Sequence, residues 1–292
     1  MSVWTAKAER GSPSLIRLIA WLAKAVGRPF CRGLLYPIVL YFVLTDPLAR
    51  RASREFLSAA TGCPVRWIDV FGHLYCFAAT LLDRVYMAAG EFDRFHVSIE
   101  GDALVRSALE SGKGCLLLGS HLGSFDLMML ANKKFKGLPV NIMMHIDGHS
   151  RVRQIAGIED SQASIIPLGR PDSFLRAYEL LKRGDMVAIL ADRVDGSGAC
   201  LDSVFLGKPA SFPLGPHVLA ARVGAPVILC FGLYEGGADY RIEFMEFGRP
   251  APVDSRGAML QPVVDRYASL LEQVARRHPM NWFNFYPYWT KR

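Results

Sequence analysis

Residues 116–130, LLLGSHLGSFDLMML, place one histidine and one aspartate inside an otherwise apolar run. The three leucines predict a buried strand, and the apolar run that follows Ser124 predicts a helix. Gly119 and Gly123 allow the chain to turn between these two elements, and Ser124 is a suitable N-cap for the helix. A strand that passes through such a loop into a helix is the building unit of α/β sheets.

The turn gives a chemical meaning to the spacing of His121 and Asp126. On an uninterrupted helix, residues five apart would point about 140° away from each other. With the turn, His121 lies in the loop and Asp126 lies in the first helical turn, where the helix dipole favours a carboxylate. Asp126 would then hydrogen-bond one imidazole nitrogen and leave the other to take a proton from a hydroxyl. The alternative is a capped loop whose histidine is satisfied by a nearby carbonyl.

Short apolar runs alternate with helical patterns through the rest of the chain. The expected strands are residues 95–100, 114–119, 140–144, 164–167, 186–191, 226–233 and 240–244. The expected helices are residues 101–111, 124–134, 172–182, 215–223 and 262–277, after a helical region at 52–90. This alternation predicts an α/β fold, a sheet layered by helices. We expect a mixed central sheet flanked by helices.

The positive charge of the 292-residue chain is concentrated at its N-terminus. The net charge is +7, and residues 1–54 contain nine basic and two acidic side chains, so the remaining residues are balanced. A nucleic-acid-binding protein would usually carry basic charge on its folded domain, whereas a basic apolar segment suits anionic lipid headgroups. We therefore expect a membrane-associating segment at residues 1–54 and a folded domain at residues 55–292. Six cysteines without a C-x-x-C pair indicate a reducing compartment.

The N-terminal segment is apolar but short for a membrane span. Residues 14–26 have the pattern of an amphipathic helix, and residues 33–45 are the most apolar run in the chain. That run is shorter than the roughly 20 residues of a spanning helix, and it contains Pro37. Because both flanks are basic, we expect a segment that lies in one leaflet. A tilted single span that starts near residue 20 and an ordinary helical extension are the alternatives.

Several blocks resemble the lysophospholipid acyltransferase superfamily, and within it the bacterial lipid A late acyltransferases. His121 to Asp126 looks like the H-x4-D/E motif of that superfamily. The other matching blocks are LLKRGD before ILADRVDG, then SVFLGKPASFPLGPHVLAARVGAPVI, and the aromatic tail HPMNWFNFYPYW. The N-terminal block LLYPIVLYFVLTDPLARRASREFL is closer to relatives found with aryl polyene and other specialised lipid pathways.

The resemblance implies an acyltransferase domain at residues 55–292. His121 would activate a hydroxyl of a lipid or glycolipid acceptor, supported by Asp126, and the hydroxyl would attack an acyl thioester of acyl carrier protein or coenzyme A. Backbone N–H groups near Ser124 would stabilise the oxyanion. No metal or organic cofactor is implied, and the expected location is the cytoplasmic face of the bacterial inner membrane. The substrate-binding positions expected on this basis are Gly123, Ser124, Arg170, Asp192 and Arg193, of which the last three could instead form a structural ion-pair cluster.

Two further features of the sequence, and the function itself, leave alternatives open. His145, Asp147 and His149 form an H-x-D-x-H that suits zinc poorly, and Arg151 and Arg153 beyond it could contact an acidic acceptor or the carrier protein. The aromatic tail is expected as a buried last strand, with a place at the lipid headgroups as its alternative. A hydrolase or thioesterase that uses the same dyad, and a non-catalytic lipid-binding protein, remain the rival functions.

Overall fold

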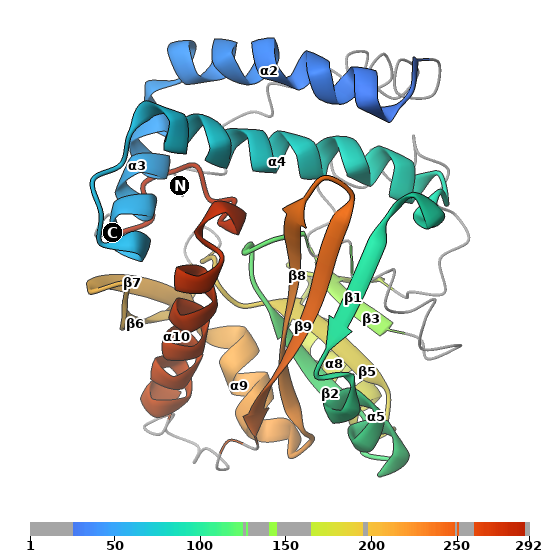
Figure 1. Cartoon of the computed structure of the whole chain (residues 1–292). Helices are drawn as coiled ribbons and strands as arrows, with labels where there is room; N and C mark the ends of the chain where they lie inside the picture. Colours follow the sequence, from blue (N-terminus) through green and yellow to red (C-terminus); the bar gives the residue numbers. More distant parts are fainter. Residues whose placement is uncertain are drawn as a thin grey trace.

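A computed structural model describes residues 26–124, 127, 140–144, 165–194, 198–248, 250 and 260–289. Its centre is a seven-stranded sheet in the order β1-β9-β8-β2-β5-β3-β4 (Figure 1). β8 and β9 pair antiparallel, and the other neighbouring strands pair parallel, so the mixed sheet expected from the sequence is confirmed. The strands are β1 (His96–Glu100), β2 (Cys115–Gly119), β3 (Val140–Met144), β4 (Ile165–Pro167), β5 (Met186–Leu190), β8 (Val227–Gly236) and β9 (Asp239–Gly248).

Helices flank this sheet, as the sequence predicts. The described helices are α2 (Arg28–Thr45), α3 (Pro47–Thr61), α4 (Trp67–Ala88), α5 (Asp102–Glu110), α8 (Ser173–Lys182), α9 (Leu214–Val223) and α10 (Leu260–Arg277), with short 3-10 turns η1 (Phe92–Arg94) and η2 (Pro279–Asn281). The helix expected at residues 124–134 and the amphipathic segment at residues 14–26 fall almost entirely outside the described residues.

The central strand β2 divides the core between the two faces of the sheet. All five of its residues are buried, and successive side chains point to opposite faces. Leu116 and Leu118 join a core built with α3, α8, α9 and α10, whereas Cys115 and Leu117 join a second core built with α4 and α5. A strand covered on both faces must be apolar at every position, which is why the run before Gly119 contains no polar side chain.

The structure contains a separate hairpin at residues 200–213, where the strands expected from the sequence include none. β6 (Cys200–Phe205) and β7 (Lys208–Pro213) pair antiparallel. The two-residue turn between them is Leu206-Gly207, and both residues have positive φ, 52° and 77°. Such turns normally carry Asn-Gly or Asp-Gly, so this hairpin lacks the usual sequence signal. Its inward-facing Phe205 and Phe212 are fully buried.

The aromatic tail is buried at residues 281–284 and half-buried at residues 285–289, and it does not form the expected last strand. After η2 it continues without regular structure. It pairs with the loop after β2 through an isolated antiparallel β-bridge between Leu122 and Trp282. Trp282 is fully buried and stacks on Phe56, with ring centroids 5.1 Å apart and an interplanar angle of 8°. The strand prediction was wrong because aromatic side chains, rather than strand pairing, hold this segment.

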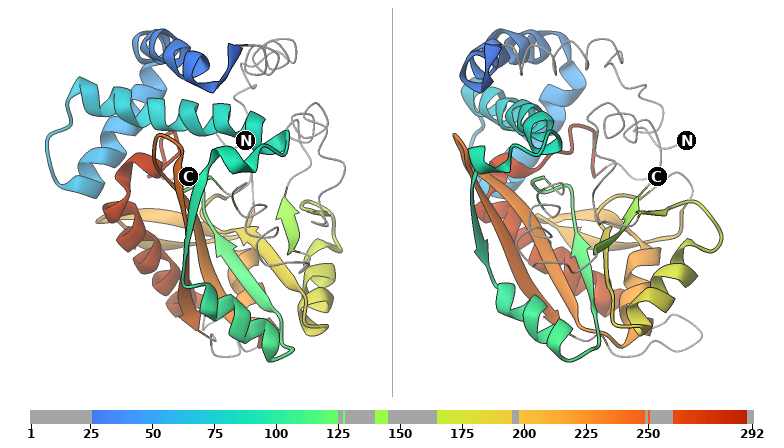
Figure 2. Two further views of the ribbon diagram at one scale, coloured as in Figure 1. Left: turned by 45° about the vertical axis from the view of Figure 1, so that its right-hand side comes forward. Right: turned by 90° about the vertical axis from the view of Figure 1, so that its right-hand side faces the viewer.

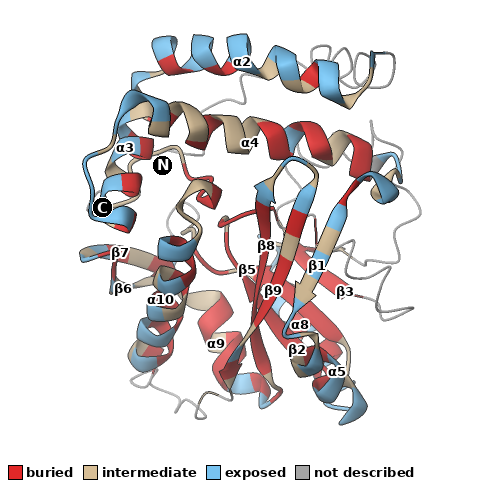
Figure 3. Ribbon diagram, viewed as in Figure 1, coloured by how far each residue is buried: buried red, intermediate tan, exposed pale blue. Residues whose placement is uncertain are grey.

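α2 and α4 lie across the end of the sheet where β8 turns into β9, and α2 is the outer of the two (Figures 1 and 2). The outward face of α2 is exposed (Figure 3), although its residues are mostly apolar.

Among the described helices, no single one is long and apolar enough to cross a bilayer. α2 and α3 together pass that test, but they are bent by 96°. α3 runs through residue 54, the boundary expected from the sequence, and its Phe56 and Leu57 belong to the main core.

Candidate active site

His121 lies in the loop that follows the carboxyl end of β2. The segment after η2 borders this loop on one side, because Gly123 N–H donates to the Asn281 carbonyl (2.6 Å) and Phe283 N–H donates to the His121 carbonyl (3.1 Å). β8 borders it on another side through a parallel bridge between Gly123 and Gly232. The position of His121 is therefore set by a central strand, by β8 and by a distant part of the sequence.

Glycine is required at the contact between this loop and β8. Gly123 has φ +85°, and a Cβ added to it would lie 2.1 Å from the Gly232 carbonyl oxygen. A Cβ on Gly232 would lie 2.2 Å from the Ser124 carbonyl oxygen. The turn expected at Gly123 is thus observed, and the reason for the glycine is close backbone approach as well as the left-handed conformation.

The imidazole of His121 is paired with Asp192, two residues beyond the end of β5. His121 Nδ1 lies 2.9 Å from Asp192 Oδ1, and the His121 backbone N–H donates to Asp192 Oδ2 at 3.0 Å. An ionised carboxylate can only accept hydrogen bonds, so Nδ1 carries the proton and the lone pair is on Nε2. The His121 side chain is 30% exposed and that of Asp192 is 0% exposed, so the imidazole is accessible while its carboxylate partner is covered.

Asp192 is itself held by side chains from the C-terminal segment. Asn284 Nδ2 donates to Asp192 Oδ2 at 3.3 Å, and the Tyr288 hydroxyl donates to the Asp192 backbone carbonyl at 2.9 Å. On α10, the Tyr267 hydroxyl donates to the Gly119 carbonyl at 2.8 Å, directly before the loop that carries His121. A buried carboxylate needs such partners, and this set fixes its orientation toward His121.

The electrostatics of the pair favour a neutral imidazole beside an ionised carboxylate. Burial is the largest influence on His121, and together with the charge of Arg193 it holds the pKa of the imidazole below its ordinary value of 6.5. Burial alone would raise the pKa of Asp192, but the attraction of His121, their hydrogen bonds and Arg193 together lower it. At neutral pH His121 is therefore ready to accept a proton.

The predicted partner of His121, Asp126, lies outside the described residues, so that pairing stays a prediction. Gly123 and Ser124 are at the site, but their backbone N–H groups already donate to the carbonyls of Asn281 and Gly232. Ser124 N–H is therefore not free for an oxyanion, contrary to our expectation for the start of this helix. The Ser124 hydroxyl is buried and makes no hydrogen bond within the described part of the chain.

The structure brings Asp192 and Arg193 to the site and leaves Arg170 apart from the contacts that build it. Arg193 Nη2 donates to the Phe283 carbonyl at 3.1 Å and Nε donates to Asn284 Oδ1 at 2.5 Å, so it ties β5 to the C-terminal segment. Arg170 is exposed in the turn between β4 and α8, where its carbonyl accepts a hydrogen bond from the Ser173 hydroxyl. β4 ends at the same edge of the sheet as β2. A role for Arg170 in substrate binding stays a prediction.

Sequence reasoning missed Asn281, Asn284 and Tyr288. The three residues are in the tail NWFNFYPYW, which we interpreted through its aromatic rings alone. The available signal was the pair of asparagines inside an apolar block, because buried amides are retained where they satisfy specific hydrogen bonds. Here the Asn281 amide bonds the backbone of Tyr234 on β8, and the Asn284 amide donates to Asp192.

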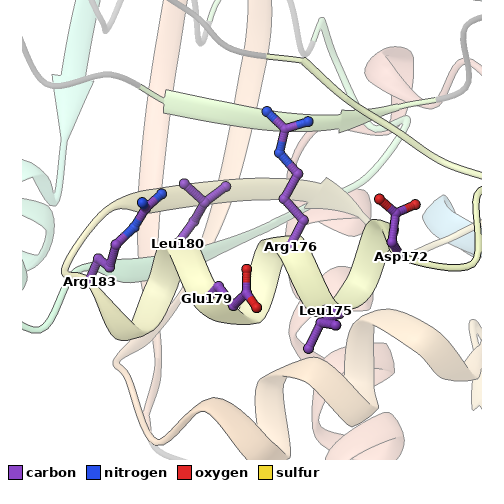
Figure 4. Close-up of a pocket in the computed structure, with 6 residues that line it drawn as sticks. All are labelled: Asp172, Leu175, Arg176, Glu179, Leu180 and Arg183. Atoms are coloured by element: carbon purple, nitrogen blue, oxygen red, sulfur yellow. The ribbon is translucent and has the colours of Figure 1, made fainter.

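A hollow on the described surface lies along α8, and His121 is not among the residues that line it. Its volume is about 370 Å³, and its lining comes from α8 and the residues at its two ends (Figure 4). Its lining residues are Asp172, Leu175, Arg176, Glu179, Leu180 and Arg183. No group of three metal-ligating side chains occurs among the described residues, and the H-x-D-x-H at 145–149 lies outside them.

Comparison with known proteins agrees with the resemblance. Two phosphatidylinositol mannoside acyltransferases, from the CDC 1551 / Oshkosh and ATCC 25618 / H37Rv strains of Mycobacterium tuberculosis, are each 25% identical to this chain over 190 residues. Each alignment covers 63% of this chain and 57% of the mycobacterial protein. Residues 83–291, which include the whole site described above, match the bacterial lipid A biosynthesis acyltransferases. The chain therefore belongs to the bacterial lipid A biosynthesis acyltransferase family.

Proposed function

We propose that this protein is a membrane-associated acyltransferase that moves a fatty acyl chain from a thioester to a hydroxyl of a lipid or glycolipid. The observation that carries the proposal is the pairing of His121 Nδ1 with buried Asp192, at 2.9 Å, which leaves Nε2 as the basic atom on an accessible side chain. Membership of a lipid-biosynthetic acyltransferase family supports the reaction class.

In the proposed reaction His121 Nε2 takes the proton of the acceptor hydroxyl as its oxygen attacks the thioester carbonyl. A new C–O bond forms, and the tetrahedral intermediate collapses with cleavage of the C–S bond. The departing sulfur takes the proton back from the imidazolium, so His121 returns to its neutral form. Asp192 stabilises the transient imidazolium and holds the tautomer that keeps Nε2 basic. The thiol carrier is acyl carrier protein or coenzyme A.

The proposed place of action is the cytoplasmic face of the bacterial inner membrane. α2 carries exposed apolar side chains along its outward face, and its inner side packs on α4. A helix packed in this way lies parallel to a membrane surface, so we propose that α2 enters one leaflet in the plane of the interface. The lipid acceptor and the acyl chain would then reach the site from the bilayer.

Lipid mass spectrometry of a deletion strain tests the proposal. The strain is complemented with wild type, with His121→Ala, and with a matched control, His96→Ala, whose imidazole is 83% exposed. We expect a lipid that lacks one acyl group in the deletion strain and in the His121→Ala strain, and the complete lipid in the other two. An unchanged lipidome in the deletion strain would refute the transferase. Release of free fatty acid at one rate with and without acceptor would favour a hydrolase instead.

A further inference from the structure

A buried group of charged and aromatic side chains fastens α2 to the rest of the protein. Asp83 of α4 is fully buried and receives a two-pronged contact from Arg28, with Nε–Oδ1 at 2.7 Å and Nη2–Oδ2 at 2.9 Å. Arg32 Nη2 (2.8 Å) and the Tyr240 hydroxyl (2.7 Å) also donate to Oδ2. We call this group, together with Tyr234, the Asp83 cluster.

The Asp83 cluster joins four elements at one point. Arg28 and Arg32 belong to α2, Asp83 belongs to α4, and the tyrosines belong to β8 and β9. Arg32 Nη1 donates to the Tyr234 hydroxyl at 2.5 Å. Both arginines also donate to the carbonyl of Gly237, in the turn between β8 and β9. α2 is thus bonded to the sheet that carries the catalytic loop as well as to its neighbouring helix.

Directional bonds are needed here because apolar packing alone does not define how α2 sits. Its buried residues are Cys31, Val39 and Val43, and most of the rest of the helix is apolar on every side. Such a helix could roll on α4 with little loss of apolar contact. Buried ion pairs seldom stabilise a fold more than apolar residues would, and in some proteins their role is to specify register. The forked contacts of Arg28 and Arg32 fix one rotation of α2.

That rotation leaves the outward face of α2 without charge. Arg28 and Arg32 are the only charged residues of the helix, and their side chains are 15% and 13% exposed. The exposed large apolar side chains of α2 are Phe30, Leu34, Tyr36, Ile38, Leu40, Tyr41, Phe42 and Leu44. The cluster therefore determines which face of α2 meets lipid.

The same cluster is continuous with the catalytic loop. The backbone N–H and carbonyl of Tyr234 bond the side-chain amide of Asn281 at 2.7 and 3.0 Å. The backbone carbonyl of Asn281 accepts the N–H of Gly123 at 2.6 Å, two residues from His121. A path of short hydrogen bonds thus runs from the helix that would touch the membrane to the loop that carries the base.

We infer that Arg28, Arg32 and Asp83 are positioning residues that hold the lipid-facing surface of α2 at a fixed orientation to His121. The inference rests on the proposed function. In this arrangement His121 Nε2 lies at a fixed distance from the bilayer surface, where the acceptor hydroxyl is found. If α2 is loosened, the rest of the protein can tilt or move away from the membrane. An acceptor dispersed in detergent reaches His121 without that constraint.

The test compares acyl transfer to one acceptor in two physical states. The acceptor is the lipid that the deletion strain identifies, presented either in phosphatidylethanolamine–phosphatidylglycerol vesicles or in detergent micelles. The variants are Asp83→Asn and Tyr234→Phe, the second of which removes one hydroxyl and leaves every charge in place. The matched control is Asp102→Asn, which breaks the exposed Asp102–Arg106 pair on α5. Hydrogen exchange of α2 and of residues 119–124 is followed in parallel.

For Asp83→Asn we expect a loss of about tenfold or more in kcat with vesicles and little change in detergent, since small misplacements of reacting groups are costly. Tyr234→Phe should also lower the ratio of kcat with vesicles to kcat in detergent, and it should speed hydrogen exchange in both α2 and residues 119–124. Asp102→Asn should change neither the ratio nor the exchange. If Asp83→Asn lost kcat equally with vesicles and in detergent, the change would be simple destabilisation and the inference would be overturned. An unchanged ratio of vesicle to detergent kcat in Tyr234→Phe would overturn it as well. If wild type transferred nothing to any lipid, the proposed function itself would fail, and faster exchange in Tyr234→Phe would still show the coupling of α2 to the loop.

Discussion

Both oxygens of the Asp192 carboxylate bind His121, one through the backbone N–H at 3.0 Å and the other through the imidazole Nδ1 at 2.9 Å. One residue therefore sets both the position of the loop and the tautomer of the His121 imidazole. The two hydrogen bonds also join the ends of β2 and β5, which are neighbouring strands. Support for the base thus comes from a residue distant from it in sequence.

Replacing Asp192 with asparagine should lower kcat/KM by about 10²- to 10⁴-fold, because the amide neither stabilises the imidazolium nor enforces the Nδ1–H tautomer. The matched control is Asp185→Asn, which removes a carboxylate from the Arg183–Asp185 contact. The same measurement on Asp126→Asn compares the two carboxylates. A loss confined to Asp126→Asn would assign support of the base to Asp126 instead.

Activity should depend on pH through His121. Because burial and Arg193 lower the pKa of this imidazole, the acidic limb of the kcat/KM profile should have its midpoint below 6.5, and activity should be constant above it until another group titrates. In Asp192→Asn the residual activity should show a limb at still lower pH, since a negative charge that favours the imidazolium has been removed. A midpoint above 6.5 in wild type would contradict the described environment of His121.

Gly123→Ala should abolish transfer and destabilise the protein, because the new Cβ would overlap the Gly232 carbonyl at 2.1 Å and the residue has positive φ. Gly72→Ala is the matched control: this glycine is inside α4 and has nothing within 4 Å of an added Cβ. That change should stabilise the protein by about 0.5–1 kcal/mol. Denaturant unfolding and the transfer assay measure both effects, and an active Gly123→Ala would refute the close contact.

Acid should destabilise the fold through two buried histidines outside the site. Burial lowers the pKa of His73 and of His217 to about 4. The unfolded chain binds protons near pH 6.5 and the folded chain does not, so stability is retained above pH 6.5 and falls between pH 6.5 and 4, by an amount on the order of 3 kcal/mol for each histidine.

His217→Asn tests this dependence, because the asparagine amide can keep the hydrogen bond to the Pro213 carbonyl but does not titrate. Its free energy of unfolding should fall less steeply with acid than that of wild type. His96→Asn, at an exposed position, should follow wild type. Identical pH slopes in wild type and His217→Asn would exclude His217 as a contributor.

Binding to anionic vesicles should depend on the outward face of α2. Leu40→Asp places a charge on that face and should weaken binding to phosphatidylglycerol vesicles by about tenfold or more, since it removes apolar area and adds a charge that anionic lipid repels. Val204→Asp makes a comparable change at an exposed apolar residue of β6 and should bind as wild type does. Equal binding by both variants would exclude α2 as the lipid-contacting element.

The sequence predicted the sheet well because its central strands are buried on both faces, and a short continuous apolar run such as 115–119 is typical of such a strand. It predicted that His121 lies in the loop after this strand, because the two glycines and the serine around it favour a turn there. It did not reveal the contact with Asp192, since loops that meet at a sheet edge leave no mark in local spacing. The β6–β7 hairpin was missed for a local reason, its Leu206-Gly207 turn. The irregular tail was missed for a tertiary reason, because aromatic contacts with distant residues override its strand-like composition.

The hydrogen bonds between the C-terminal segment and the site affect when the site forms during folding. Asn281 and Phe283 bond the loop that carries His121, and Asn284 bonds Asp192. They join residues beyond α10 to residues near the middle of the chain, and contacts of such long sequence separation form late in folding. During synthesis the strands around β2 can pair before the segment beyond α10 has left the ribosome. Such an intermediate would have a sheet but no Asp192 aligned with His121, so the proposed activity would arise only when the last segment docks.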